Sequence, residues 1–349
     1  MPVALTNLLD VFALGFDDII DVRAPAEYAE DHIPGAISLP VLDDEERARV
    51  GTIYKQVNPF TARKLGAALV ARNAAAHLLG PLADKPGGWK PLVYCWRGGQ
   101  RSGSFATILS QIGWRVDTIA GGYKTWRGLV VRALYDTPFP ARVVVLDGNT
   151  GSAKTDVLNL LPARGVQIID LEGLARHRGS LFGAVAGGQP AQKAFEGALA
   201  LEIARLDPTR PVVIEAESSK VGECRLPPEL WKAMVAAPRV AIAAPRSARS
   251  EYLVRAYDDL VEDGARLADV IGQMKRLHSA EVLAEWQAMA TAGQFRILAD
   301  ALMAQHYDPR YEKHRARMAV PLAEIGADSL TPLALQDVAD QVAAAVSGL

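Results

Sequence analysis

The chain has 349 residues, of which 50% are hydrophobic and 22% are charged, and its formal net charge is −2. This composition is typical of a soluble globular protein, and the length is sufficient for two domains. No apolar run approaches the ~18–20 residues that span a bilayer. The N-terminus has no basic region typical of a signal peptide, so we expect a cytoplasmic protein without membrane association.

The low net charge excludes binding of a polyanion through the overall field of the protein, so local clusters of Arg and Lys would have to do this. The chain contains two cysteines, Cys95 and Cys224, without the paired spacing of a metal site. We therefore expect neither a disulfide framework nor a bound structural metal.

The first part of the chain alternates strand-like and helix-like segments. Short apolar runs at Asp18–Val22, 92–94 and 116–119 predict strands, and 104–112 has helical spacing. An Ala-, Leu- and Arg-rich segment from Glu45 to Leu79 predicts a helical insert, which extends to the Pro86-Gly-Gly break. Strands that alternate with helices predict an α/β domain with a parallel sheet, over residues 1–136 with an insert at about 45–88.

A linker with two prolines, residues 136–140, separates this domain from a second one over residues 141–349. Strands are predicted at 142–147, 166–170, 211–215 and 240–244, again with helices between them. From Ser247 onward the periodicity is helical up to the tail. We therefore predict a second parallel-sheet domain that ends in a helical region.

A cysteine at the end of a predicted strand opens a loop rich in glycine and arginine. Between a strand and a helix, backbone N–H groups converge and form a nest for an anion. A helix N-terminus also stabilises a thiolate, which is the nucleophilic form of cysteine. A buried structural cysteine would not explain the glycines and arginines that follow directly. The loop comprises Cys95, Trp96, Arg97, Gly98, Gly99, Gln100, Arg101 and Ser102, and Arg97 and Arg101 would surround a bound oxyanion.

A glycine-rich loop follows the first strand of the second domain and opens a helix, which is the setting of a Walker A phosphate-binding loop. The loop comprises Gly148, Asn149, Thr150, Gly151, Ser152, Ala153, Lys154 and Thr155. Its amides would cradle phosphates, Lys154 would bridge them, and Thr155 would hold Mg²⁺ if a metal is bound. Ala153 stands where the pattern has glycine. We therefore predict phosphate binding without inferring ATP hydrolysis.

Acidic and basic residues follow the other strands of the second domain. Glu215 and Glu217 occupy the place of a Walker B acid, although carboxylates also often end a strand in solvent. Ligands gather at the carboxyl ends of parallel strands, so basic residues there would face a phosphate-rich substrate such as RNA. About half of them could instead form a solvated face. These residues are Arg176, His177, Arg178, Arg246, Arg249 and Arg255.

Several motifs in the first domain resemble, in the right order, those of a rhodanese domain. They are Asp21-Val-Arg23, Glu27, His32-Ile-Pro-Gly-Ala36, the cysteine loop, and Gly121-Gly-Tyr123 with Trp126. In that family the cysteine carries sulfur as a persulfide. Here five residues separate Cys95 from Arg101, one more than is common, and this spacing resembles the phosphate-sized loop of protein tyrosine phosphatases.

The whole chain resembles the tRNA 2-selenouridine synthases. The resemblance is carried by residues 49–56, 94–102, 148–155, 176–180 and 306–309. It implies conversion of 2-thiouridine at the tRNA wobble position to 2-selenouridine through an S-geranyl intermediate, with geranyl diphosphate and selenophosphate as substrates. It further implies that Cys95, Arg97 and Arg101 serve selenium transfer and that the P-loop holds a diphosphate. No tightly bound cofactor is implied, and an enzyme that supplies selenophosphate is an expected partner.

Three other readings stay open from the residues alone. One is a persulfide sulfurtransferase coupled to a P-loop nucleotide-binding domain, and the second is a C-x5-R phosphatase. The third is a protein without enzymatic activity that only binds anions at both loops. Replacement of Cys95 would leave only the third unaffected, and activity on an aryl phosphate would identify the second.

Overall fold

The computed structural model describes residues 2–315 and 319–348, and the chain divides into two compact units. The first unit comprises Met1–Pro138 and Pro190–Arg205, and the second comprises Phe139–Gln189 and Leu206–Leu349. The division after Pro138 falls in the predicted linker. The segment Pro190–Arg205 differs from the expected continuous second domain, because its helix α9 (Gln192–Ala204) packs with the first unit.

The first unit is built on a four-stranded parallel sheet of order β2-β1-β3-β4, as the alternating pattern predicted. The strands are β1 (Asp18–Asp21), β2 (Ile37–Ser38), β3 (Pro91–Tyr94) and β4 (Asp117–Thr118). The helices around them are α1 (Asp10–Ala13), α2 (Pro25–Glu30), α5 (Gln100–Ile112) and α6 (Tyr123–Val131), which continues as a π-helical turn to Asp136. Apolar side chains of β1, β3 and α5 form the core, among them Ile20, Val93 and Phe105.

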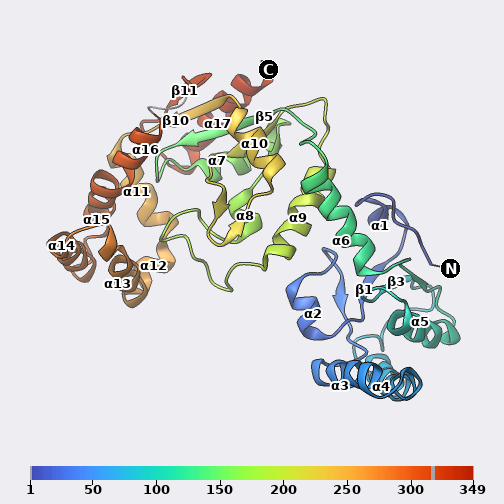
Figure 1. The fold of residues 1–349 in the computed structure, drawn as a ribbon. Coiled ribbons are helices and arrows are strands. Elements are labelled where there is room, and N and C mark those ends of the chain that lie inside the picture. The colour runs from blue at the N-terminus through green and yellow to red at the C-terminus, as the bar shows by residue number, and fades with distance from the viewer. Residues whose placement is uncertain (1, 316–318, 349) are drawn as a thin grey trace. The chain divides into compact units, whose positions relative to one another are not determined.

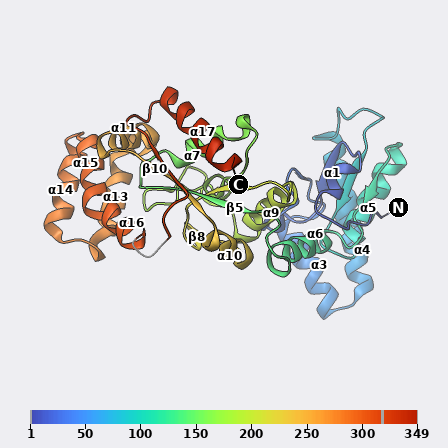
Figure 2. The same ribbon diagram turned by 90° about the horizontal axis from the view of Figure 1, so that it is seen from above.

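The predicted helical insert is a hairpin of two helices, α3 (Asp44–Gln56) and α4 (Pro59–Leu79). Asp43 and Glu46 form a capping box that starts α3, and Asn58 accepts a hydrogen bond from the Thr61 N–H at the start of α4. The side of α4 that faces the sheet is buried through Val70 and Ala74. In Figure 2 the α3–α4 hairpin projects from the rest of the first unit.

The second unit contains a five-stranded parallel sheet of order β11-β10-β5-β7-β6 (Figure 1). Its strands are β5 (Val143–Gly148), β6 (Gln167–Ile169), β7 (Val212–Glu215), β10 (Arg239–Ala243) and β11 (Ala323–Gly326). The strand β11 corrects the expectation of helix alone after Ser247. It is a short edge strand with Ile325 as its one buried residue, so no apolar alternation marked it.

Helices cover this sheet and extend beyond it. One apolar cluster joins the strands to α7 (Lys154–Leu160), α11 (Arg246–Ala256) and the terminal helix α17 (Pro332–Ser347). The remaining sheet-associated elements are α8 (Leu171–Ala175), α10 (Pro228–Ala236) and a hairpin of β8 (Lys220–Val221) and β9 (Cys224–Arg225). The sheet thus places the carboxyl end of its central strand, β5, directly before α7.

A second apolar cluster, centred on the buried Trp286, forms a separate helical group in this unit. Its helices are α12 (Asp258–Glu262), α13 (Gly264–Gln273), α14 (Ala280–Thr291), α15 (Phe295–Leu302) and α16 (Asp308–Arg315), with a π-helical turn at Met303–Tyr307. The predicted helical region is therefore confirmed. Within the described ranges, every helix is too short or too polar to cross a membrane.

Candidate functional site

The cysteine loop connects β3 to α5, as the sequence predicted. Cys95 is buried directly after Tyr94, and its Sγ atom lies 3.3 Å from the Ser102 hydroxyl, which donates to it. Gly99 takes a positive φ of 73° at the position before α5, which glycine adopts without steric cost. The sulfur therefore lies beside the first turn of a 13-residue helix, where the helix dipole favours an anion.

The other loop residues surround this position. Trp96, Arg97, Gly98 and Gln100 are exposed, and Gly99 is half-buried. A Cβ atom added at Gly98 or Gly99 would have no heavy atom within 4 Å, apart from those of the residues next to it in sequence. The loop therefore leaves open space over the two glycines, as an anion nest requires.

The glycine pair before α6 fixes the base of the cysteine loop. The Tyr123 and Lys124 N–H groups donate to the Cys95 and Trp96 carbonyls at 2.8 and 3.0 Å. A Cβ at Gly122 would lie 2.3 Å from the Cys95 carbonyl oxygen, so only glycine allows this approach. The Trp96 ring stacks on that of Tyr123 with 5.3 Å between centroids. The Gly121-Gly-Tyr123 motif thus positions the loop.

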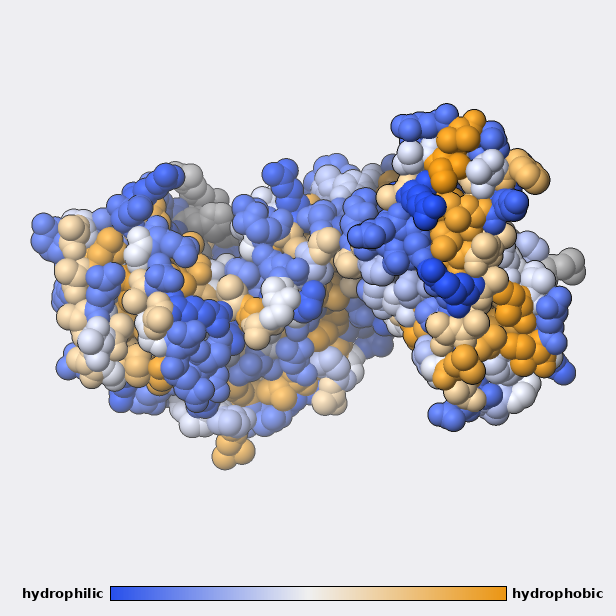
Figure 3. Space-filling model, turned by 90° about the horizontal axis from the view of Figure 1, so that it is seen from below, coloured by the Kyte–Doolittle hydropathy of each residue, from blue (hydrophilic) through white to orange (hydrophobic). Residues whose placement is uncertain are grey.

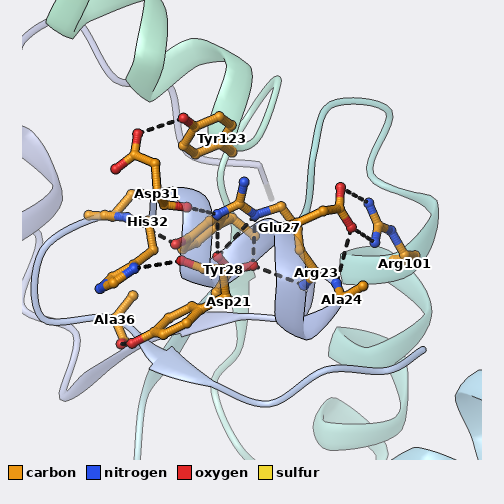
Figure 4. A network of polar contacts seen from close by, with 12 residues as sticks. Asp21, Arg23, Ala24, Glu27, Tyr28, Asp31, His32, Ala36, Arg101 and Tyr123 are labelled. Carbon is orange, nitrogen blue, oxygen red and sulfur yellow. Dashed lines mark hydrogen bonds and ion pairs between the residues drawn. The ribbon is translucent and has the colours of Figure 1, made fainter. Parts of the chain in front are cut away.

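A buried polar network holds Tyr123 in turn (Figure 4). The Arg23 guanidinium forms an ion pair with Asp21 at 2.7 Å and lies 4.0 Å from the centre of the Tyr123 ring. The Tyr123 hydroxyl donates to Asp31 at 2.6 Å. Burial, followed by this hydrogen bond, raises the pKa of Tyr123 above its usual range. The Asp21-Val-Arg23 motif therefore supports the cysteine loop through Tyr123.

Arg101 does not project freely over the loop. Its guanidinium donates to Glu27 at 2.7 and 3.3 Å (Figure 4), whereas Arg97 is exposed. Burial opposes ionisation of Glu27, but the hydrogen bonds and charge of Arg101 outweigh it and lower the pKa of that carboxyl. An oxyanion at the loop would have to share Arg101 with Glu27. Glu27 belongs to one of the rhodanese-like motifs, but nothing in the sequence around it indicates its pairing with Arg101.

The P-loop connects β5 to α7 in the second unit. Ala153 lies at the position before α7 with φ +58° and ψ +31°, the left-handed conformation that the usual glycine adopts. An L-residue pays roughly 1–2 kcal/mol for this conformation. Gly151 also has a positive φ, and a Cβ there would meet Leu253 at 2.9 Å. The chain therefore keeps the loop geometry despite the alanine substitution.

Two polar side chains of the loop, Lys154 and Ser152, have different surroundings. Lys154 Nζ donates to the Gly148 and Asn149 carbonyls at 3.0 and 3.5 Å, so it lies across the loop itself. The Ser152 hydroxyl is buried without a hydrogen-bond partner. The Ser152 Oγ atom packs against Gly148, 2.3 Å from where a Cβ of that residue would lie, so Lys154 is the one of these two side chains that can turn to a bound phosphate.

Three glutamates gather beside Thr155. The Thr155 hydroxyl lies 2.8 Å from Glu172 and 3.2 Å from Glu215, and the Glu172 N–H donates to Glu215 at 2.7 Å. The Glu217 and Glu172 carboxylates both lie beside Gly179, where a Cβ atom would meet them at 2.3 and 2.6 Å. Glu215 thus lies where the sequence predicted an acid. Glu172 was missed, and its one signal is its position just after the strand that ends at Asp170.

Burial is the main cause of the raised pKa values of Glu215 and Glu217. It raises the pKa of Glu215 well above its usual value, and the charge of Glu172 adds to the effect. For Glu217, burial followed by the charge of Glu172 raises the pKa to about 8. In the described part of the chain, no group of three or more His, Cys, Asp or Glu side chains is arranged to hold a metal ion.

Replacing Glu217 by glutamine is expected to change the pH dependence of stability. In the folded protein Glu217 keeps its proton up to about pH 8, whereas an ordinary glutamate releases it near 4.5. The folded state therefore binds more protons between these values, so stability falls as the pH rises through this window. Thermal unfolding of Glu217→Gln should show a smaller decline from pH 5 to pH 8. The exposed Glu45→Gln should behave like the wild type; an identical decline in both variants would contradict the assignment.

One predicted arginine is brought to the P-loop. Arg249 is buried, donates to the Thr150 carbonyl at 3.1 Å, and forms two hydrogen bonds to Asp308 at 2.9 and 2.8 Å. Asn149 donates to the same carboxylate at 2.9 Å. Asp308, which sequence reasoning did not select as a site residue, therefore ties the P-loop to α16.

The other predicted basic residues have different surroundings. Arg178 pairs with Asp259 at 2.8 Å, Arg246 with Asp300 at 3.4 Å, and Arg255 donates to the Leu330 carbonyl at 2.7 Å. Arg176 is exposed. His177 is half-buried with an unpartnered Nδ1, and burial lowers its pKa. Arg178, Arg246 and Arg255 are thus engaged with other residues of this unit.

An apolar pocket opens beside the P-loop. Thr150 of the loop contributes to its wall, and the rest comes mainly from α11, α12, α15 and the π-helical turn after α15. Side chains that line it include Leu253, Tyr257, Phe295, Leu298, Leu302 and Met303. The unit therefore combines a phosphate cradle with an adjoining hydrophobic pocket, which suits a ligand with an anionic head and an apolar tail.

A cysteine loop on one parallel-sheet unit and a P-loop on the other define a rhodanese-like domain joined to a P-loop domain. Two family models match accordingly. The rhodanese-like domain matches residues 5–129, and the tRNA 2-selenouridine synthase AAA domain matches residues 141–279. The chain belongs to the tRNA 2-selenouridine synthase family.

Relatives support this membership over most of the chain. The tRNA 2-selenouridine synthase of Aeromonas salmonicida is 35% identical over 333 residues, which cover 86% of this chain and 89% of the relative. That of Bordetella bronchiseptica is 34% identical over 346 residues and covers 90% and 92%. A solved N-terminal domain of a putative ATP/GTP binding protein from Clostridium difficile is 36% identical over 38% of this chain and 99% of its own, with a TM-score of 0.32.

Proposed function

We propose that this protein converts 2-thiouridine at the wobble position of tRNA to 2-selenouridine through S-geranyl-2-thiouridine. Geranyl diphosphate and selenophosphate are the two donors, and tRNA is the acceptor. The observation that carries the proposal is the presence in one chain of a thiol at an anion nest and a P-loop beside an apolar pocket. The reaction is inferred from family membership. The P-loop with its pocket suits geranyl diphosphate, and the cysteine loop suits selenophosphate.

The P-loop unit suits the geranyl transfer. Lys154 and the loop amides would hold the diphosphate, and the pocket lined by Leu253 and Phe295 would take the geranyl chain. The sulfur of thiouridine attacks the first carbon of the geranyl group, the carbon–oxygen bond breaks, and diphosphate leaves. Neutralising that leaving group and orienting the two reactants would supply most of the catalysis. Thr155 and Glu215 are the groups that Mg²⁺ would contact if the diphosphate carries one.

The cysteine loop suits the selenium transfer. Selenophosphate carries a tetrahedral phosphate, and the five residues between Cys95 and Arg101 give a loop of that size. The nest at Gly98 and Gly99 would bind its oxygens, with Arg97 and Arg101 beside them. The selenium of selenophosphate would attack the ring carbon of the geranylated uridine, and the carbon–sulfur bond breaks so that geranyl thiol leaves. Water then cleaves the selenium–phosphorus bond, which releases phosphate and leaves 2-selenouridine. A selenophosphate-supplying enzyme is the partner that this step requires.

The test is mass spectrometry of nucleosides from thiolated tRNA incubated with the purified protein, geranyl diphosphate and selenophosphate, each omitted in turn. We expect S-geranyl-2-thiouridine when selenophosphate is omitted and 2-selenouridine when both donors are present. No change in the nucleoside, with intact tRNA, would reject this function in favour of persulfide sulfur transfer. Release of phosphate from an aryl phosphate would favour the phosphatase.

A further inference from the structure

The α3–α4 hairpin carries a long basic stretch after its acidic first turn, Asp44–Glu46. Between Arg47 and Ala83 there is no Asp or Glu, although the whole protein has a net charge of −2. Six basic residues fall in this stretch: Arg47, Arg49, Lys55, Arg63, Lys64 and Arg72. The core receives Val50 of α3 and one side of α4, and none of these six cations belongs to it.

Most of this charge is free to meet a partner. Arg72 is paired with Glu46, and Arg47 lies 3.8 Å from Glu27. The cations near the turn between the two helices, Lys55, Arg63 and Lys64, are exposed. Because no carboxylate lies nearby in this stretch of sequence, their field is uncompensated along the hairpin and would attract a polyanion.

Large apolar side chains are exposed at the same end of the hairpin. The exposed fractions are 53% for Tyr54, 64% for Val57 and 71% for Phe60. On α4, Phe60 precedes Arg63 and Lys64 by three and four residues, so these side chains share one face of the helix. Figure 3 shows hydrophobic and strongly hydrophilic residues interleaved on this side of the first unit. We name Tyr54, Lys55, Val57, Phe60, Arg63 and Lys64 the hairpin tip.

We propose that the hairpin tip is an RNA-docking surface. Its cations bind phosphates, and unpaired bases stack on Tyr54 and Phe60. Aromatic rings among basic residues are the means by which proteins bind single-stranded RNA. A membrane-binding helix instead exposes an apolar face along its length. In the described hairpin, the large apolar residues that are exposed lie at the tip, except Leu79 at the far end of α4.

This proposal rests on the proposed function, because the RNA concerned is the tRNA substrate. It deepens that function by assigning tRNA contacts to the helical insert, whereas Arg178, Arg246 and Arg255 of the second unit are already engaged in ion pairs and hydrogen bonds. The loop of a tRNA anticodon offers unpaired bases together with a phosphate backbone, and the hairpin tip has groups for both.

The test is binding of the full-length protein to a fluorescent anticodon stem-loop, measured by anisotropy at several salt concentrations. The charge variant Lys55→Glu with Lys64→Glu should weaken binding about tenfold or more and flatten the salt dependence by roughly one to two phosphate contacts. The stacking variant Tyr54→Ala with Phe60→Ala should weaken binding by about tenfold or more with an unchanged salt slope. All four side chains are exposed, so thermal unfolding should stay close to that of the wild type.

Matched controls separate this proposal from its alternatives. Lys90→Glu with Lys232→Glu makes the same change in net charge at exposed sites elsewhere, and Leu79→Ala removes an exposed apolar side chain from the same hairpin; both should bind RNA like the wild type. Wild-type affinity in both tip variants would overturn the docking surface while leaving the function intact. Failure of the wild type to bind tRNA would overturn both. Binding to phosphatidylglycerol vesicles that the tip variants alone lose, with RNA affinity unchanged, would assign the surface to membranes instead.

Discussion

Replacing Cys95 by alanine is expected to abolish formation of 2-selenouridine in the purified protein, a loss of at least about 10³-fold. The Cys95 thiol lies at the start of the loop before α5, and the Ser102 hydroxyl donates to its sulfur at 3.3 Å. Removing it leaves the nest and the P-loop unit in place. Formation of S-geranyl-2-thiouridine and binding of tRNA should therefore continue, which distinguishes a lost reaction from a lost fold.

Cys224→Ala is the matched control for this experiment. Cys224 is also buried, it lies in the β9 strand of the second unit, and burial raises the pKa of its thiol. Its removal should leave both steps of the reaction near wild-type rates. Selenium incorporation that persists in Cys95→Ala, or that is lost equally in both variants, would contradict the role of Cys95.

Replacing Lys154 by alanine is expected to weaken the binding of geranyl diphosphate at least tenfold, because a charge-assisted hydrogen bond to phosphate is worth about 1.5–3 kcal/mol. The ammonium group lies across the loop on the Gly148 and Asn149 carbonyls and can turn from them to a phosphate. Calorimetry with geranyl diphosphate and with inorganic diphosphate measures this loss. Both ligands should lose affinity by a similar factor, since Lys154 contacts the shared head group.

The exposed Lys232→Ala serves as the control for Lys154→Ala, because it removes the same charge from helix α10. It should bind both ligands like the wild type. Unchanged affinity in Lys154→Ala would contradict a diphosphate at the P-loop. A loss for geranyl diphosphate alone would indicate that the lysine acts on the apolar pocket and not on the head group.

The two loops could be predicted from sequence because their chemistry is local. Cys95 and Lys154 each follow an apolar strand and begin a helix within a few residues, so spacing alone fixes their setting. The alternation of strands and helices predicted two parallel-sheet domains, and the resemblance of their motifs to rhodanese and Walker A motifs indicated the class of each. Family resemblance then connected these loops to one reaction.

Other parts of the site depend on contacts between residues far apart in sequence. Asp308 reaches Asn149 across 159 positions, and Glu172 meets Thr155 only because β7 pairs with both β5 and β6. The edge strand β11 carries too few buried residues to show a period. Pairing of Arg101 with Glu27 likewise spans 74 positions, so the charge near the cysteine could not be assigned from the loop alone.

Helix α9 follows the linker in sequence but packs in the first unit, and this arrangement determines which fragments cleavage of the linker would release. Residues 1–138 are joined to the rest of the chain by one peptide bond, yet Arg127 and Tyr135 bind Glu196 of α9, and Glu30 binds Lys193. Phe195 of α9 is also fully buried. A protease that cleaves after Pro138 would therefore leave two fragments that stay together in solution. The first fragment alone would lack a piece of its own fold.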